Sequence, residues 1–129
     1  MRIVIADDSG LMRERLQQML SPIEQLEIVG SFANGIETLE ALRTLKPDLA
    51  ILDLNMPGLN GLQVLSEICK EGKNLKFIIL TLYASRYYQK LAIHSGADYF
   101  FSKVDDFETV GLLVREMIAN DGISNKLIN

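Results

Sequence analysis

The chain has 129 residues, which fits one compact domain of roughly 100–200 residues. Hydrophobic residues make up 48% of it, enough for one buried core. The 13 basic and 17 acidic residues give a formal net charge of −4, which excludes the basic surface that nucleic-acid binding requires. Because Cys69 and His94 are the only cysteine and histidine, an internal disulfide and multi-cysteine or multi-histidine metal motifs are excluded as well.

No apolar run approaches the ~18 residues that a membrane span requires, and no stretch has the low complexity of a disordered segment. We therefore expect a reduced, soluble, cytoplasmic domain that contacts neither membrane nor nucleic acid. Carboxylates, hydroxyls and a few amines remain as its chemical groups.

Five short apolar runs are rich in β-branched or aromatic residues and too continuous for strands with one exposed face. They predict strands that are buried on both faces of a parallel sheet. In chain order these runs are Arg2–Ala6, Leu26–Phe32, Leu49–Leu52, Phe77–Leu80 and Tyr99–Phe101.

Longer segments with a helical spacing of apolar residues follow the strands. Ser9 is expected to cap the first helix, and Gly96 to end the fourth in a left-handed conformation. The other three open on residue pairs with the spacing of a capping box. These pairs are Asn34 with Glu37, Asn60 with Gln63, and Asp105 with Glu108. In chain order, we expect helices from Ser9 to Leu20, over Ile36–Leu45, over Leu62–Lys70, over Ala84–Ser95, and from Asp105 onward.

This alternation predicts an α/β fold, a (βα)5 doubly wound five-stranded parallel sheet between two helical layers. We expect residues 1–119 to form one domain and residues 120–129 a short C-terminal tail. Ligands of such sheets bind beyond the carboxyl ends of the strands, so functional residues are expected there.

Chemically useful side chains do follow the strands. Asp7 and Asp8 follow the first strand, Asp53 the third, and Thr81 the fourth, while Lys103 comes two residues after the fifth. Three carboxylates and one ammonium leave a charge of −2, which calls for a cation. Oxygen ligands without His or Cys favour Mg²⁺ or Mn²⁺. A carboxylate nucleophile beside a divalent ion, an ammonium and a hydroxyl suits phosphoryl transfer.

The sequence has no P-loop, no dinucleotide-binding glycine motif and no nucleophile elbow.

Four motifs occur in a fixed order at these positions: Ile5-Ala6-Asp7-Asp8-Ser9, Asp53-Leu54-Asn55-Met56-Pro57-Gly58, Thr81, and Gly96-Ala97-Asp98 leading to Lys103. Together they resemble the receiver domain of two-component response regulators over about residues 1–118. The resemblance implies a CheY-like, flavodoxin-like fold. It also implies that Asp53 is the phosphoacceptor, served by a sensor histidine kinase, a phosphotransfer protein or a small phosphodonor. Thr81 is then expected to hydrogen-bond the phosphoryl group, and Lys103 to pair with one of its oxygens.

The same resemblance implies a magnesium site. Asp8, Asp53 and the backbone carbonyl of Asn55 are expected to ligate Mg²⁺, with Mn²⁺ as a substitute, and Asp7 to hold a metal-bound water. No further cofactor is expected.

The resemblance also implies an output surface on the fourth predicted helix (helix 4), the fifth predicted strand (strand 5) and the fifth predicted helix (helix 5). There the movement of Thr81 is coupled to an aromatic ring, here Phe100. Tyr83, Tyr87 and Tyr88 lie on the loop before helix 4 and on its first turns. We expect them to form a docking or dimerisation surface for a downstream protein, an effector domain or a second copy of the chain.

Three positions depart from the family pattern. Leu82 replaces a small residue after Thr81 and is expected to narrow donor access or to limit the movement of Thr81. Val104 replaces a proline, so we expect a trans peptide bond after Lys103. Phe100 stands where tyrosine is common and lacks its hydroxyl.

The main hypothesis is a signalling switch that catalyses only its own phosphorylation and slow dephosphorylation, rather than a turnover enzyme. One alternative is a receiver-like binding module that works without phosphorylation, which Leu82 and Val104 keep open. Another is an aspartate-nucleophile phosphatase, suggested by Asp53-Leu54-Asn55.

Overall fold

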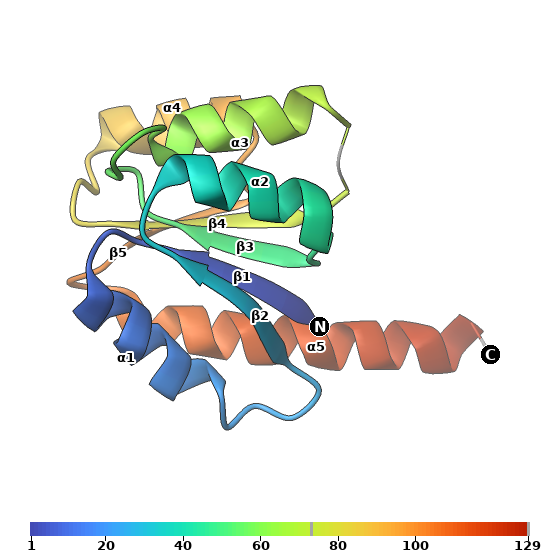
Figure 1. Cartoon of the computed structure of the whole chain (residues 1–129). Helices are drawn as coiled ribbons and strands as arrows, with labels where there is room; N and C mark the ends of the chain where they lie inside the picture. Colours follow the sequence, from blue (N-terminus) through green and yellow to red (C-terminus); the bar gives the residue numbers. More distant parts are fainter. Residues whose placement is uncertain (73, 129) are drawn as a thin grey trace.

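Five parallel strands form one sheet, as predicted, and the structure gives their order as β2-β1-β3-β4-β5 (Figure 1). The computed structural model describes residues 1–72 and 74–128, and side chains only as far as residue 120. The elements are β1 (Arg2–Ala6), α1 (Gly10–Leu20), β2 (Glu27–Phe32), α2 (Gly35–Leu45), β3 (Leu49–Leu52), α3 (Gly61–Lys70), β4 (Lys76–Thr81), α4 (Arg86–Ser95), β5 (Tyr99–Ser102) and α5 (Phe107–Ile128).

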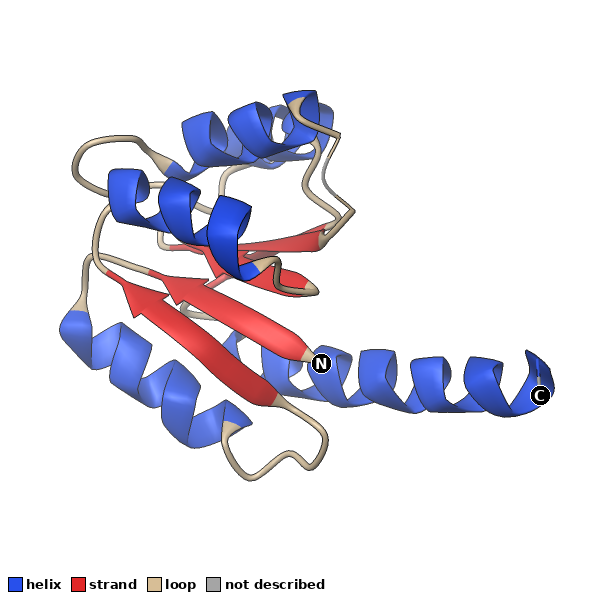
Figure 2. Cartoon of the chain, turned by 45° about the vertical axis from the view of Figure 1, so that its right-hand side comes forward, coloured by secondary structure: helices blue, strands red, loops and turns tan. Residues whose placement is uncertain are grey.

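The helices form two layers around the sheet: α1 and α5 cover one face, and α2, α3 and α4 cover the other (Figure 2). Alternate residues of the central strands point to opposite faces. In β1, for example, Val4 packs with the α2–α4 layer, whereas Ile3 and Ile5 pack with the α1–α5 layer. The strand order reverses between β1 and β3, so the loops after these two strands flank the usual ligand-binding crevice.

The three inner strands are buried on both faces, but the prediction of full burial is wrong for the edge strands. In β2 Glu27 is exposed and the other residues are only partly buried. In β5 Tyr99 is exposed, while Phe100 and Phe101 are half-buried. The apolar content of a run does not reveal whether its strand lies inside the sheet or at its edge, because that depends on the order of the strands.

Most helix ends follow the predicted capping residues. Ser9 Oγ accepts a hydrogen bond from Met12 N, and Asn60 and Gln63 form both bonds of the capping box at 2.9 Å. Gly96 ends α4 with φ = 117°. Two helices begin two residues later than predicted: α4 at Arg86 and not at Ala84, and α5 at Phe107 and not at Asp105.

Helix α5 continues to Ile128 and crosses the predicted domain boundary at residue 119, which stays a prediction. In the described part of the chain, no helix has the length and apolar character needed to cross a membrane.

Two glycines place helices directly against the loop after β3. A Cβ atom on Gly61, the first residue of α3, would overlap the backbone carbonyl of Asp53. A Cβ atom on Gly35, the first residue of α2, would overlap the carbonyl of Leu59. In addition, Gly35 N donates a 3.0 Å hydrogen bond to Pro57 O. The two helices therefore hold this loop by close backbone contact.

Candidate functional site

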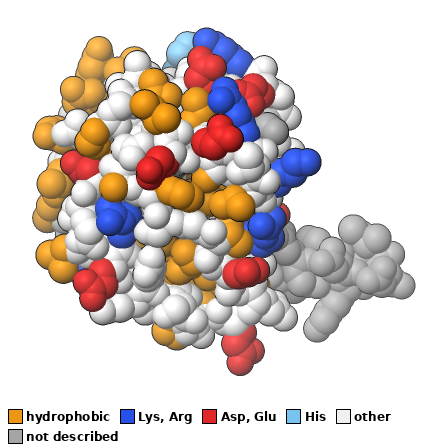
Figure 3. Space-filling view, viewed as in Figure 1, with side chains coloured by type: hydrophobic (Ala, Val, Ile, Leu, Met, Phe, Trp, Pro, Cys, Tyr) orange, Lys and Arg blue, Asp and Glu red, His pale blue; other side chains and the backbone are white. Residues whose placement is uncertain are grey.

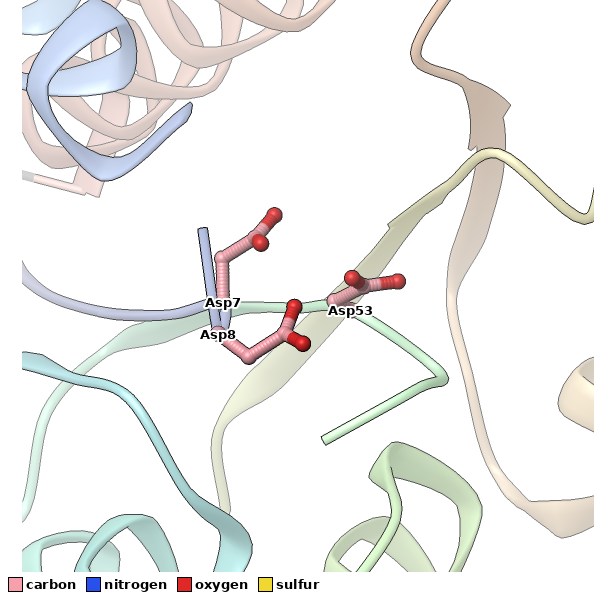
Figure 4. Close-up of side chains that lie close together, drawn as sticks. All are labelled: Asp7, Asp8 and Asp53. Atoms are coloured by element: carbon pink, nitrogen blue, oxygen red, sulfur yellow. The ribbon is translucent and has the colours of Figure 1, made fainter. Parts of the chain in front are cut away.

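Three acidic side chains meet where β1 and β3 end. Ala6 and Leu52 are paired in the sheet, so the residues that follow them, Asp7 and Asp53, leave it side by side. One carboxylate oxygen from each of Asp7, Asp8 and Asp53 lies within 4.8 Å of the others (Figure 4). Among the described residues this is the only group of three or more acidic, His or Cys side chains close enough to share a metal ion.

Lys103 reaches this cluster from the loop after β5. Its Nζ lies 2.6 Å from Asp7 Oδ2 and 2.9 Å from Asp53 Oδ2, and its side chain is only 5% exposed. Burial by itself lowers the pKa of Lys103, but the hydrogen bonds to the two carboxylates outweigh burial and raise the pKa above its usual value. Lys103 is therefore a fixed positive charge at neutral pH.

Asp7 is buried, and the loop around it is held by short-range hydrogen bonds. Burial raises the pKa of Asp7, although the hydrogen bonds from Lys103 and from Ser9 N oppose this shift. Arg13 Nη1 donates a 2.7 Å bond to the backbone oxygen of Asp7. Arg13 was not predicted as a site residue, since its only signal in the sequence is its position in the first turn of the helix that follows the acidic pair. Asp8, in contrast, is exposed.

The donor set fits a hard divalent cation. Asp7, Asp8 and Asp53 with Lys103 leave a charge of −2, and every candidate ligand atom is an oxygen. Asn55 stays close to Asp53, because its backbone N–H points to Asp53 Oδ1 at 3.4 Å, while its side chain is exposed. The first residues of the loop after β3 therefore fold back toward the carboxylate of Asp53.

Thr81 joins the two loops on the other side of the site. It is fully buried at the end of β4. Its Oγ1 accepts a 3.0 Å hydrogen bond from Tyr83 N, and its backbone oxygen accepts a 2.9 Å bond from Lys103 N. A displacement of Thr81 would therefore reach both the β4–α4 loop and the loop that carries Lys103.

Two residues that depart from the family pattern, Leu82 and Val104, lie beside the site. Leu82 and Val104 are 64% and 76% exposed, and both line a hollow of about 570 Å³ between the β4–α4 and β5–α5 loops. The described residues contain no cis peptide bond, so the bond after Lys103 is trans, as predicted.

Ser102, the last residue of β5, and Asp106, the last residue of the β5–α5 loop, were not predicted as site residues from the sequence. Ser102 Oγ accepts hydrogen bonds from Val104 N at 3.1 Å and Asp105 N at 3.3 Å. Asp106 Oδ2 accepts a 2.9 Å bond from Ser102 N. Ser and Asp on either side of Lys103 are typical of such local turns, which is a weak signal because these residues are common in loops.

The three tyrosines of the predicted docking surface face solvent, while their docking role stays a prediction. Tyr83, Tyr87 and Tyr88 are exposed, and Tyr88 contacts the other two rings edge-on at centroid distances of 6.3 and 5.4 Å. Figure 3 shows hydrophobic side chains along the left-hand edge of the molecule, where the loops after the strands lie in Figure 1. Phe100 is half-buried and packs against the α2–α4 side of the core, whereas Phe101 packs against the α1–α5 side.

Comparison with known proteins agrees with this arrangement. The family model described as the response regulator receiver domain matches residues 3–115. The oxygen regulatory protein NreC of Staphylococcus epidermidis is 35% identical over 89% of this chain and 53% of its own length. The protein-glutamate methylesterase/protein-glutamine glutaminase 1 of Syntrophomonas wolfei is 36% identical over 79% of this chain and 29% of its own length. The chain thus spans about half or less of these curated relatives.

A solved structure gives the same answer for the fold. A chain in the crystal structure of the CheX-CheY-BeF3-Mg²⁺ complex from Borrelia burgdorferi has a TM-score of 0.80 and 28% identity, covering 92% of this chain and 87% of that one. The family match spans most of the sequence, and the strand order and the cluster at the strand ends accord with it. The chain therefore belongs to the receiver domains of two-component response regulators.

Proposed function

We propose that this chain accepts a phosphoryl group on Asp53 in a Mg²⁺-dependent reaction and thereby acts as a switch. The observation that carries the proposal is the ion pair of the buried Lys103 with Asp53, in a cluster of three carboxylates. Asp53 Oδ2 is engaged by Lys103, whereas Oδ1 receives only the 3.4 Å contact from Asn55 N. One oxygen of the carboxylate is therefore available as a nucleophile.

In this reaction an oxygen of Asp53 attacks the phosphorus atom of the donor. The new O–P bond forms as the bond between phosphorus and the leaving atom breaks, and the leaving atom takes the electron pair. The ammonium of Lys103 offsets the negative charge of the transferred group. The hydroxyl of Thr81 accepts a bond from Tyr83 N, which leaves its own hydrogen free to bind a phosphoryl oxygen.

The metal in this proposal is Mg²⁺, with Mn²⁺ as a substitute. Asp8, Asp53 and the backbone carbonyl of Asn55 are its protein ligands, and Asp7 acts through a bound water. The all-oxygen cluster supports this assignment, and Mg²⁺ is named in the solved complex of a similar chain. When bound, the ion supplies positive charge to the phosphoryl oxygens.

The switch involves the surface formed by α4, β5 and α5. Ala92 is the only buried residue of α4, whereas α3 buries four, so α4 is the more weakly anchored helix. The bond between Thr81 and Tyr83 N links the site to the loop before α4. We propose that phosphorylation repositions this loop and Phe100. The contact surface would then consist of Leu82, Tyr83, Tyr87 and Tyr88.

The partners follow from this role. A sensor histidine kinase or a phosphotransfer protein supplies the phosphoryl group in the cytoplasm. A downstream protein, an effector domain or a second copy of the chain binds the switched surface. The net charge of −4 supports the absence of nucleic-acid contact through this chain. We propose no turnover activity, since the match to the methylesterase covers only 29% of that enzyme.

Incubation with acetyl phosphate and Mg²⁺ tests the proposal and separates its alternatives. We expect one phosphoryl group per chain, absent from Asp53→Asn and present in the control Asp105→Asn. Continuous hydrolysis of added phosphoesters would instead favour the aspartate-nucleophile phosphatase. No labelling of the folded wild-type protein would favour the phosphorylation-independent binding module.

A further inference from the structure

The loop that delivers Lys103 to the acidic cluster is short. β5 ends at Ser102 and α5 begins at Phe107, so only four residues connect them. The backbone N–H of Lys103 is tied to Thr81 O at 2.9 Å, which anchors the beginning of the loop to β4. The rest of the loop needs other contacts to keep its course.

Two side chains provide these contacts from opposite ends of the loop. The hydroxyl of Ser102, which is 9% exposed, accepts bonds from the next two free backbone N–H groups, those of Val104 and Asp105. Asp106 forms two hydrogen bonds with Ser102, both of 2.9 Å: Asp106 Oδ2 accepts from Ser102 N, and Asp106 N donates to Ser102 O. Ser102 therefore uses its amide, its carbonyl and its hydroxyl within the same loop.

Beyond Lys103, the hydrogen bonds that hold the loop backbone run mainly through Ser102 and Asp106. Val104 has no proline ring to restrict its backbone, and its side chain is 76% exposed, so packing does not hold it. Lys103 Nζ must reach Asp7 and Asp53 simultaneously through a long side chain with several rotatable bonds. A small shift of the loop backbone would separate the ammonium from one of its two partners, and misplacements of this kind reduce catalysis strongly.

We propose that Ser102 and Asp106 are positioning residues for Lys103, and that their hydrogen bonds hold its ammonium between Asp7 and Asp53. The two residues do not touch the reacting atoms. They act through the loop backbone. The expected effect on the rate of phosphorylation rests on the proposed function of Asp53. The expected effect on the position of Lys103 rests on geometry alone.

The first experiment measures the rate at which acetyl phosphate labels Asp53 at saturating Mg²⁺. Asp106→Ala and Ser102→Ala are each expected to slow labelling by about threefold to tenfold, the size of effect that loss of one or two hydrogen bonds produces. Asp106→Asn keeps an acceptor for Ser102 N and is expected to stay within about twofold of the wild type. Asp105→Ala removes a neighbouring charge that this network does not use, so the same rate as in the wild type is expected.

The second experiment observes Lys103 directly in the metal-free protein. Its ammonium protons exchange slowly enough for NMR only while they are held by Asp7 and Asp53. We expect the ammonium signal of Lys103 in the wild type and in Asp105→Ala, and its loss in Asp106→Ala, with the remaining spectrum still folded. A role limited to stability would lower the melting temperature and leave this signal and the labelling rate unchanged, which would overturn the inference.

The two readouts separate this inference from the proposed function. If the wild type is labelled and Asp106→Ala is labelled equally fast, the positioning role is wrong and the function of Asp53 stands. If the wild type is not labelled at all, the proposed function fails, and the NMR signal in Asp106→Ala still decides whether Asp106 positions Lys103.

Discussion

Lys103 lies closer to Asp7 than to Asp53: Nζ is 2.6 Å from Asp7 Oδ2 and 2.9 Å from Asp53 Oδ2. The resemblance implied only that Lys103 pairs with a phosphoryl oxygen. In the structure the lysine instead bridges the ends of β1 and β3. Because both carboxylates are buried, one ammonium compensates two buried negative charges, and the site stores electrostatic repulsion that a further cation would relieve.

We predict that Asp7→Asn stabilises the metal-free protein by roughly 1 kcal/mol, a usual size for one substitution, and weakens Mg²⁺ binding. Asparagine has a single acceptor oxygen, so it keeps only one of the two bonds that Asp7 accepts, from Ser9 N at Oδ1 and from Lys103 Nζ at Oδ2. We expect the removal of a buried negative charge to outweigh the lost bond. The raised pKa of Asp7 means that the folded protein binds this proton more tightly than the unfolded chain does. Stability therefore falls as the pH rises from 3.8 through the folded pKa.

Urea unfolding of both proteins at pH 4 and pH 8, without metal, checks this prediction. The advantage of Asp7→Asn should be larger at pH 8, where more of Asp7 is charged than at pH 4. A variant that is less stable than the wild type at pH 8 would contradict it.

A second prediction concerns alkaline pH. The pKa of Lys103 is raised above 10.5, so its ion pairs contribute stability that is fully present below pH 10.5 and is lost as the pH rises through the folded pKa. In Lys103→Met the decrease in unfolding free energy that the titration of Lys103 causes should be absent. Unfolding free energies measured between pH 8 and pH 11.5 provide the test, and parallel curves for the two proteins would rule out the proposed contribution.

The glycines that open α1, α2 and α3 form a matched series. We predict that Gly35→Ala destabilises the fold by about 2 kcal/mol or more, because the new methyl group meets the backbone carbonyl of Leu59. Gly10→Ala should be nearly neutral, since the nearest neighbour of its Cβ is the end of the Arg13 side chain at 3.6 Å. Thermal unfolding of both variants measures the difference. Equal melting temperatures would mean that the β3–α3 loop does not depend on this close approach.

A further prediction concerns the tyrosine surface. Tyr87 is 66% exposed and Ile36, on α2, is 63% exposed, so alanine at either position should change stability little. Tyr87→Ala should weaken phosphorylation-dependent self-association or partner binding, whereas Ile36→Ala should not. Sedimentation velocity with and without beryllofluoride, a phosphoryl mimic, compares them. If Tyr87→Ala and Tyr88→Ala leave both self-association and partner binding unchanged, the docking surface lies elsewhere.

The parts of this fold that depend on local sequence could be predicted, and the parts that depend on strand order could not. The strands Arg2–Ala6 and Leu49–Leu52 and the caps at Ser9 and Asn60 agree with the structure, because apolar runs and capping bonds involve neighbouring residues. The partial exposure of β2 and β5 was missed, since it arises from their places at the edges of the sheet.

The same distinction applies to the site. Asp7, Asp8 and Asp53 could be grouped in advance, because parallel strands bring their carboxyl ends to one edge. The pairing of Lys103 with Asp7, and the supporting roles of Arg13, Ser102 and Asp106, depend on the paths of loops after distant strands. Ordinary turn-forming residues carry too little signal to predict such paths.

The proposed switch depends on Asp53 as the residue that receives the phosphoryl group. Its most direct test is peptide mapping by mass spectrometry after incubation with acetyl phosphate, with and without Mg²⁺, in the wild type, Asp53→Asn and Asp105→Asn. We expect one phosphoryl group on the peptide that contains Asp53. This group should depend on Mg²⁺, be retained in Asp105→Asn and be absent from Asp53→Asn. A phosphoryl group on another residue, or undiminished labelling of Asp53→Asn, would contradict it.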